Sequence, residues 1–183
     1  MVTVDGFGVP VEVAGPEKGS VVVVLGAAHQ APAAYDPVCQ RLHTASLRTG
    51  VIGPDPRLTG KSVVGILDSL DVRWALLVGD RLGGELAWEL AATRLDRFIG
   101  LVAVDRGHPR VADPAGVIRD EHCPPVELNT TVLVSTKAAR AMAVASQRFV
   151  YGEYRIVDLL GRRNAADSTA QLATEIVMRT STW

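Results

Sequence analysis

The sequence lacks several features that would assign it to a specialised class of protein. It has only two cysteines, Cys39 and Cys123, among 183 residues. Two are too few for a disulfide framework, and we expect buried or idle thiols in a reducing compartment. The formal net charge is -1, so the chain lacks the basic field that nucleic-acid binding requires. Nucleic acid is therefore not an expected partner.

Long apolar runs are also missing. The longest, residues 21–28, is far below the roughly 20 residues needed to span a bilayer, so no membrane association is expected. Residues 1–6 have neither a basic segment nor an extended apolar segment, which predicts no signal peptide and a cytoplasmic location. His122 and Cys123 follow Asp120 and Glu121, but no second group of ligands accompanies them. We therefore expect a solvated loop there, with no metal and no cofactor.

The sequence does contain a regular alternation of strand-like and helix-like segments. A hydrophobic fraction of 48% and a charged fraction of 21% are those of an ordinary globular protein, and the length favours a single domain over residues 1–183. Residues 107–125 are the only long irregular stretch, and we expect a loop or a minimal lid. Strands are expected at 2–4 and 9–13 (a hairpin), 21–25, 49–52, 74–78, 98–104, 131–134 and 154–157, and helices at 35–42, 63–70, 82–95, 138–149 and 168–178. This order predicts an α/β fold, with a mostly parallel central sheet covered by helices on both faces.

Residues 76–84 have the layout of a buried strand, a sharp turn and a closely packed helix. Gly79 and Gly83 flank the turn, and Arg81 is at its apex. This layout resembles the nucleophile elbow of the α/β-hydrolases, Gly-x-Ser-x-Gly, in which the apical serine attacks the substrate. An arginine stays protonated at ordinary pH and cannot serve as that nucleophile.

The resemblance to the α/β-hydrolase family extends over nearly the whole chain. Residues 21–26 are similar to the strand that ends in His-Gly and leads into an oxyanion-binding loop. Residues 51–62 are similar to the segment Pro-Asp-x-Arg-Gly-x-Gly-x-Ser, in which we expect Asp55 and Arg57 to form an ion pair. Residues 98–105 resemble the strand after the nucleophile helix, and the short connection that follows implies that the large cap domain of many relatives is missing.

All three catalytic positions that the resemblance implies carry other residues. Arg81 replaces the nucleophile, and residues 135–141 offer no acid after the strand at 131–134. The terminal Gly-x-x-His is present as Gly161 to Asn164, with asparagine in place of the base. Because the members of a triad act only together, three substitutions argue against a triad mechanism.

The remaining groups suggest a ligand site. In this fold the backbone N–H groups of Leu82 and Ala27 would point at an oxyanion, with Gly26 beside them. Arg81 would add a guanidinium near the N-terminus of the following helix, which suits a small anionic or acyl-type ligand. The alternative, which we favour, is that Arg81 pairs with Asp80 or Asp105.

Two classes of function remain open. The first is a non-catalytic protein that binds a ligand or a partner on the hydrolase-like scaffold. The second is an enzyme that uses unorthodox residues, with His29, Asp80 and Asp105 as candidates, for ester, thioester or lyase chemistry. For His29 a surface loop is the favoured interpretation. An exposed last strand would also allow a homodimer, which light scattering tests.

Overall fold

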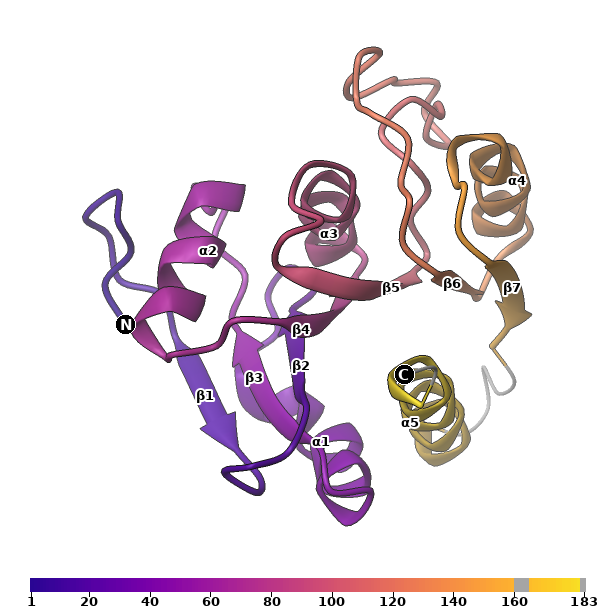
Figure 1. Ribbon diagram of the computed structural model, residues 1–183. Coiled ribbons are helices and arrows are strands. Elements are labelled where there is room, and N and C mark those ends of the chain that lie inside the picture. Colours follow the sequence, from indigo (N-terminus) through magenta and orange to yellow (C-terminus); the bar gives the residue numbers. More distant parts are fainter. Residues whose placement is uncertain (160–164, 182–183) are drawn as a thin grey trace.

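The structure is a computed structural model that describes residues 1–159 and 165–181, and these residues form a seven-stranded sheet covered by helices (Figure 1). The strand order is β1-β3-β2-β4-β5-β6-β7. Only β1 is antiparallel to its neighbour, as the pairings within the sheet show. The strands are β1 (Val11–Ala14), β2 (Val21–Leu25), β3 (Arg48–Ile52), β4 (Ala75–Asp80), β5 (Phe98–Val104), β6 (Thr130–Val134) and β7 (Tyr154–Asp158). The expected fold class, α/β with a mostly parallel sheet, is confirmed.

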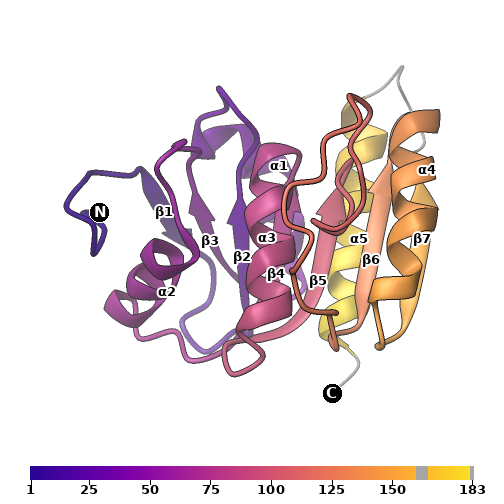
Figure 2. The same cartoon turned by 90° about the horizontal axis from the view of Figure 1, so that it is seen from above.

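Helices cover both faces of this sheet. They are α1 (Asp36–Thr44), α2 (Gly60–Ser69), α3 (Leu82–Thr93), α4 (Lys137–Ser146) and α5 (Ala165–Thr180), with two short 3₁₀ helices, η1 (Pro32–Tyr35) and η2 (Gln147–Phe149). Helices α1 and α5 lie together on one face, and α2, α3 and α4 lie on the other (Figures 1 and 2). None of the helices in the described part of the chain is long and apolar enough to cross a membrane.

The two apolar layers follow from the alternation of side chains along each strand. In β2, Val23 and Leu25 face the layer that contains α2, α3 and Trp88, whereas Val22 and Val24 face the layer of α1 and α5. Strands with both faces buried need apolar residues at every position, and the valine run of β2 meets that need.

Because β2, β4 and β5 are parallel, their carboxyl ends meet at one edge of the sheet, where ligands bind in folds of this kind.

The N-terminal segment is where the sequence prediction was wrong. Residues 2–4 form no strand, and the expected hairpin is reduced to one antiparallel bridge, between Val2 and Gly8, with backbone hydrogen bonds from Thr3 to Phe7 and from Val9 to Met1. The strand β1 instead pairs with β3, with Val11 opposite Ile52. Pairing with β3 extends the central sheet, which gives β1 more contact than a two-stranded hairpin would. Helix α5 also starts at Ala165 rather than at 168, and the helix expected over 138–149 ends at Ser146 and continues as η2.

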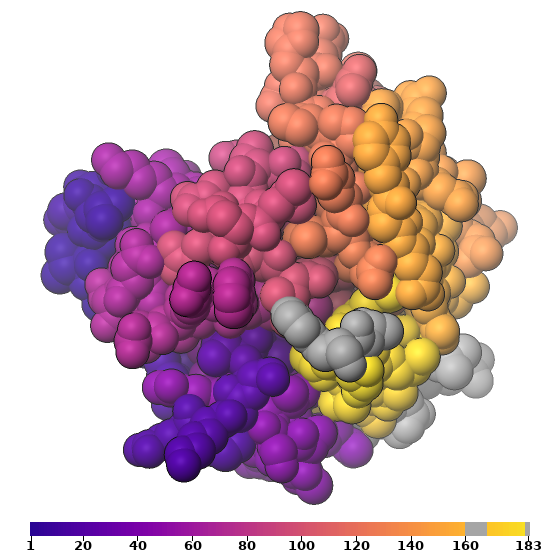
Figure 3. Space-filling view, in the orientation of Figure 1, coloured from indigo at the N-terminus to yellow at the C-terminus, as the bar shows by residue number. Residues whose placement is uncertain are grey.

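The connection between β5 and β6 contains turns and bends but neither helix nor strand over residues 107–125. In the space-filling view it projects from the body of the molecule beside α4 (Figure 3). Strand β7 has a neighbour on one side only, β6, within the described sheet. That edge is where the sequence analysis places a dimer contact, and the dimer itself stays a prediction.

Candidate functional site

Arg81 connects β4 directly to α3 in a backbone conformation that few residues adopt. Its φ is 47° and its ψ is −102°, and its N–H donates to the Val104 carbonyl at 3.0 Å. A non-glycine residue at positive φ stores strain that the surrounding structure must offset. The sharp strand–turn–helix geometry expected from residues 76–84 is therefore present, with the side chain of Arg81 at its apex.

The guanidinium of Arg81 lies between two carboxylates. Its Nη1 donates to Oδ1 of Asp80 at 3.1 Å, and its Nε is 3.9 Å from Oδ2 of Asp105. Arg81 therefore contacts both Asp80 and Asp105, the two partners that the sequence analysis considered for an ion pair. The Arg81 side chain is 50% exposed, whereas each carboxylate is 11% exposed. One positive charge beside two negative charges leaves no net positive charge at the apex of the turn.

Tyr35 contacts two groups of the expected oxyanion site. Its hydroxyl accepts a hydrogen bond from the Ala27 N–H at 2.8 Å and donates one to Oδ2 of Asp80 at 2.8 Å. Burial is the main reason that the pKa of Tyr35 is raised well above its usual value, so the phenol keeps its proton. Nothing in the sequence around Tyr35, at the end of a short 3₁₀ helix, signalled this role.

Asp105 directly follows β5, has a φ of 52° and also finds its hydrogen-bond partners within the protein. Its Oδ1 accepts the backbone N–H of Ser135 at 2.7 Å, and its Oδ2 accepts the Ser135 hydroxyl at 2.5 Å. Asp80, Asp105 and Arg81 therefore form one continuous polar network with Tyr35 and Ser135. The network is held by the ends of β4, β5 and β6, which are neighbours in the sheet.

His29 and Asn164 are the two remaining candidates from the sequence. His29 is exposed in the loop after β2, at a φ of 62°. It belongs neither to the polar network nor to the cavity described below. Asn164, the residue at the expected position of the base, lies outside the described residues together with Gly161.

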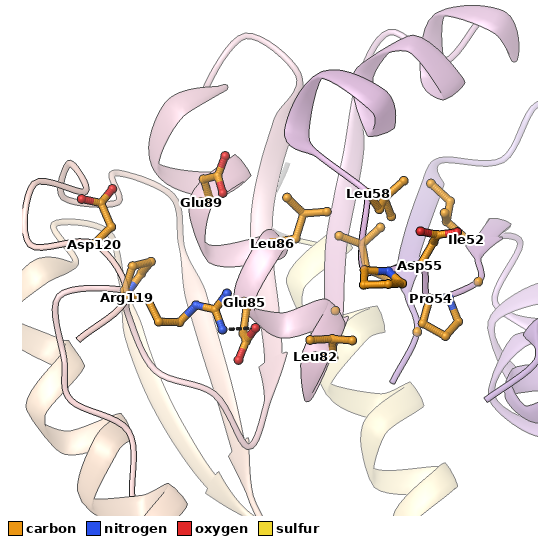
Figure 4. A pocket seen from close by; sticks show the side chains of 16 residues that line it. Ile52, Pro54, Asp55, Leu58, Leu82, Glu85, Leu86, Glu89, Arg119 and Asp120 are labelled. Carbon is orange, nitrogen blue, oxygen red and sulfur yellow. Dashed lines mark ion pairs between the residues drawn. The ribbon is translucent and has the colours of Figure 1, made fainter. Parts of the chain in front are cut away.

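A cavity of about 250 Å³ opens beside the turn, between α3, the loop after β3 and the 107–125 segment (Figure 4). Gly26 and Leu82, two of the expected ligand-binding residues, line it, whereas Ala27 and Arg81 do not. Its lining combines apolar side chains with polar side chains that are all charged. The lining residues are Leu25, Gly26, Ile52, Gly53, Pro54, Asp55, Pro56, Leu58, Leu82, Gly83, Glu85, Leu86, Glu89, Pro109, Arg119 and Asp120.

Glu85, on the first turn of α3, anchors the chain that follows β5. It accepts from Nε of Arg106 at 3.1 Å and forms a second ion pair with Nη1 of Arg119 (Figure 4). A carboxylate in the first turn of a helix also interacts favourably with the helix dipole. The sequence analysis did not identify Glu85 or Arg119, because 34 positions of separation in the chain give no local pattern.

His108 fixes the start of the 107–125 segment to the core. Its ring packs edge-on against Trp88 and stacks on Phe149, with ring centroids 5.6 Å and 4.9 Å away. Its Nδ1 accepts the Arg110 N–H, so Nε2 carries the proton and donates to the Pro124 carbonyl at 2.9 Å. Burial lowers the pKa of His108, which is consistent with a neutral ring.

Other chemistry suggested by the sequence has a structural explanation. Asp55 and Arg57 form the expected ion pair, with Nη2 2.8 Å from Oδ2. Cys39 and Cys123 are buried free thiols. Within residues 1–159 and 165–181, no group of three or more histidine, cysteine, aspartate or glutamate side chains could hold a metal ion.

Comparison with known proteins finds similarity in structure alone. No family model matches the sequence, and no curated protein matches it. Solved structures do match over nearly their full lengths. An alpha/beta hydrolase from Sphaerobacter thermophilus shares 15% identity over 99% of both chains, with a TM-score of 0.73. The enol-lactonase from Burkholderia xenovorans shares 14% identity over 94% of both chains, with a TM-score of 0.71. Epoxide hydrolase VrEH1 from Vigna radiata shares 12% identity over 99% of this chain and 97% of its own, with a TM-score of 0.73.

Proposed function

We propose that this chain, which has the α/β-hydrolase fold, is a non-hydrolytic protein that binds a small ligand in the cavity beside Arg81. Fold alone does not assign chemistry, so the proposal depends on the site. The structural neighbours that carry out hydrolysis, an enol-lactonase and an epoxide hydrolase among them, are too distant in sequence to transfer their activities.

One observation carries the proposal. The Ala27 N–H, which would stabilise an oxyanion in this fold, is already hydrogen-bonded to the Tyr35 hydroxyl. The side chain at the apex of the turn is a protonated guanidinium held by Asp80 and Asp105. A hydrolase needs a nucleophile at the apex and free donors aimed at the developing oxyanion. This site has an ion-paired, protonated side chain at the apex and a hydrogen-bonded Ala27 N–H at one of the two expected donor positions.

The sequence analysis expected Arg81 to bind an anion. Half of the side chain is exposed, so an acidic ligand has access to it. However, such a ligand would compete with two carboxylates that already compensate the guanidinium charge. We therefore place the ligand in the adjoining cavity of about 250 Å³, whose lining combines apolar and charged side chains.

The proposal predicts no turnover of p-nitrophenyl esters or acyl thioesters, and no labelling by a serine-directed fluorophosphonate. Arg81→Ser should stay silent in both assays, because a serine at the apex would lack a histidine base. Liquid chromatography with absorbance detection measures turnover, and intact-protein mass spectrometry measures labelling. Robust turnover by the unmodified chain that disappears in His29→Ala would overturn the proposal.

An enzyme with unorthodox residues is the second candidate, and one contact favours it. The Ser135 hydroxyl donates to Asp105 at 2.5 Å, which pairs a hydroxyl with a carboxylate as a base-assisted nucleophile requires. The same labelling experiment separates the two functions. Fluorophosphonate attached to Ser135, and lost in Ser135→Ala, would establish the enzyme.

A further inference from the structure

The geometry points to a ligand class for the cavity beside the elbow: a short apolar molecule that carries a guanidinium or primary ammonium group. We propose that this group binds Glu85 in place of Arg119. The inference rests on the proposed function, because it names the ligand of the same cavity. It does not depend on Arg81 or on its partners Asp80 and Asp105, which do not line that cavity.

Arg119 already places a guanidinium at the position we assign to the ligand. It comes from the 107–125 segment, lines the cavity and pairs with Glu85 (Figure 4). The Arg119 side chain is 51% exposed, whereas that of Glu85 is only 14% exposed. When the half-exposed guanidinium of Arg119 leaves, it returns to water, and Glu85 keeps its second partner, Arg106. The less exposed carboxylate that it leaves is then available to another cation.

The other charged residues of the lining also favour a positively charged ligand. Arg119 is the only basic residue among the lining residues, whereas Asp55, Glu89 and Asp120 are acidic. Arg57 already neutralises Asp55. Neither Glu89 nor Asp120 has an ion-pair partner among the residues that the structure describes. A carboxylate or phosphate ligand would face these charges, so the cavity disfavours it.

The rest of the lining fits an apolar body. Five aliphatic side chains and three prolines make up half of the sixteen lining residues, and no serine, threonine, asparagine or glutamine belongs to the lining. The volume of about 250 Å³ lies just under the roughly 300–1,000 Å³ of sites for drug-sized ligands. The aliphatic and proline residues are Leu25, Ile52, Leu58, Leu82, Leu86, Pro54, Pro56 and Pro109.

The exchange is favourable because it conserves the charge pairing at Glu85. Desolvating a carboxylate is costly unless a cation compensates it, and here a guanidinium or ammonium replaces a guanidinium. Arg106 remains on the other oxygen, with its Nε 3.1 Å from Oε1. The ligand also buries an apolar group in the cavity, and Arg119 makes no such contribution.

The experiment compares four probes of one chain length: n-butylguanidinium, n-butylammonium, 1-butanol and butyrate. Binding is measured by chemical-shift perturbation in NMR with the full chain and with Arg119→Ala. We expect Arg119→Ala to bind n-butylguanidinium about tenfold more tightly than the unmodified chain, a difference of about 1.4 kcal/mol. The double variant Arg119→Ala with Glu85→Gln should lose this gain. Arg94→Ala, which removes an arginine from an ion pair at the far end of α3, is the matched control and should not change affinity.

Three results would overturn the inference: tighter binding of butyrate or 1-butanol than of the two cations, no gain in Arg119→Ala, or no binding of any probe. Arg119→Gln replaces Arg119→Ala if the alanine variant unfolds, and a thermal denaturation curve checks this. Any of these results would overturn the ligand class without affecting the proposed absence of hydrolysis, because ester turnover and fluorophosphonate labelling test hydrolysis separately. Conversely, turnover in those assays would overturn the proposed function while the cation preference could still be measured.

Discussion

At the scale of single residues, the Tyr35 hydroxyl joins two groups that are distant in the sequence, the Ala27 N–H and the Asp80 carboxylate. All three lie in the protein interior. A buried donor or acceptor that loses its partner costs about 1–3 kcal/mol. The hydroxyl therefore matters to stability as well as to the oxyanion site that it occupies.

Tyr35→Phe should lower the free energy of unfolding by about 1–3 kcal/mol, because it leaves the Ala27 N–H and one Asp80 oxygen without this partner. Urea denaturation followed by circular dichroism measures the change. Tyr151→Phe removes a hydroxyl from a side chain that is 73% exposed and should leave stability within about 0.5 kcal/mol. Equal effects of the two substitutions would show that the bridge contributes nothing.

The residues of the site differ in how far the sequence could predict them. The Asp55–Arg57 pair and the partners of Arg81 were predictable, because neighbours in the chain or at adjacent strand ends must lie close. Tyr35 and Arg119 were not, since each reaches its partner through a loop whose path depends on the whole fold. Their contacts with Asp80 and Glu85 span 45 and 34 positions of the chain.

At the scale of elements, the turn between β4 and α3 brings the helix very close to β2. A methyl group added at Gly83 would collide with the backbone of Leu25, around its carbonyl carbon and oxygen. Backbone atoms in the centre of a sheet cannot move aside as a flexible side chain can. Close packing therefore requires a glycine at position 83, whereas the positive φ of this turn belongs to Arg81, two residues earlier.

Gly83→Ala should destabilise the protein by about 1–3 kcal/mol or more, the usual cost of overpacking. Thermal and urea unfolding measure the loss. Gly50→Ala, in β3, is the control: no atom lies within 4 Å of an added methyl group there, and we expect a change under about 1 kcal/mol. An unchanged Gly83→Ala variant would mean that α3 is free to shift away from β2.

The elements themselves could be predicted from sequence where burial on both faces imposed a strong pattern. Strand β2 and the turn after β4 fall where the valine run and the glycine spacing placed them. The strand pairing at the N-terminus could not be predicted. Residues 2–4 and 9–13 show only a weak alternation of apolar and polar side chains, and either segment could lie at the edge of a sheet. Pairing with β3, which no local pattern encodes, decided the position of β1.

At the scale of the whole molecule, alternating strands and helices were sufficient to predict a parallel sheet covered on both faces. The cavity was not predictable in this way, since α3, the loop after β3 and the 107–125 segment build it together. The buried thiols also belong to this scale, because the packed interior sets their protonation. Burial raises the pKa of Cys39, and it raises that of Cys123 to about 11 from a usual 9.0.

Stability should fall at alkaline pH as a consequence. A thiol whose pKa is raised on folding keeps its proton more tightly in the folded state, so the folded state binds more protons than the unfolded state above pH 9. The contribution of Cys123 is therefore fully present below pH 9 and is lost progressively as the pH rises from 9 through 11. Its share of the loss should be about 1 kcal/mol by pH 10. Urea denaturation at pH 8, 9 and 10 measures the slope, which should be shallower in Cys123→Ala than in the unmodified chain. Parallel slopes in the two proteins, or stability that rises over this interval, would contradict a buried, protonated thiol at position 123.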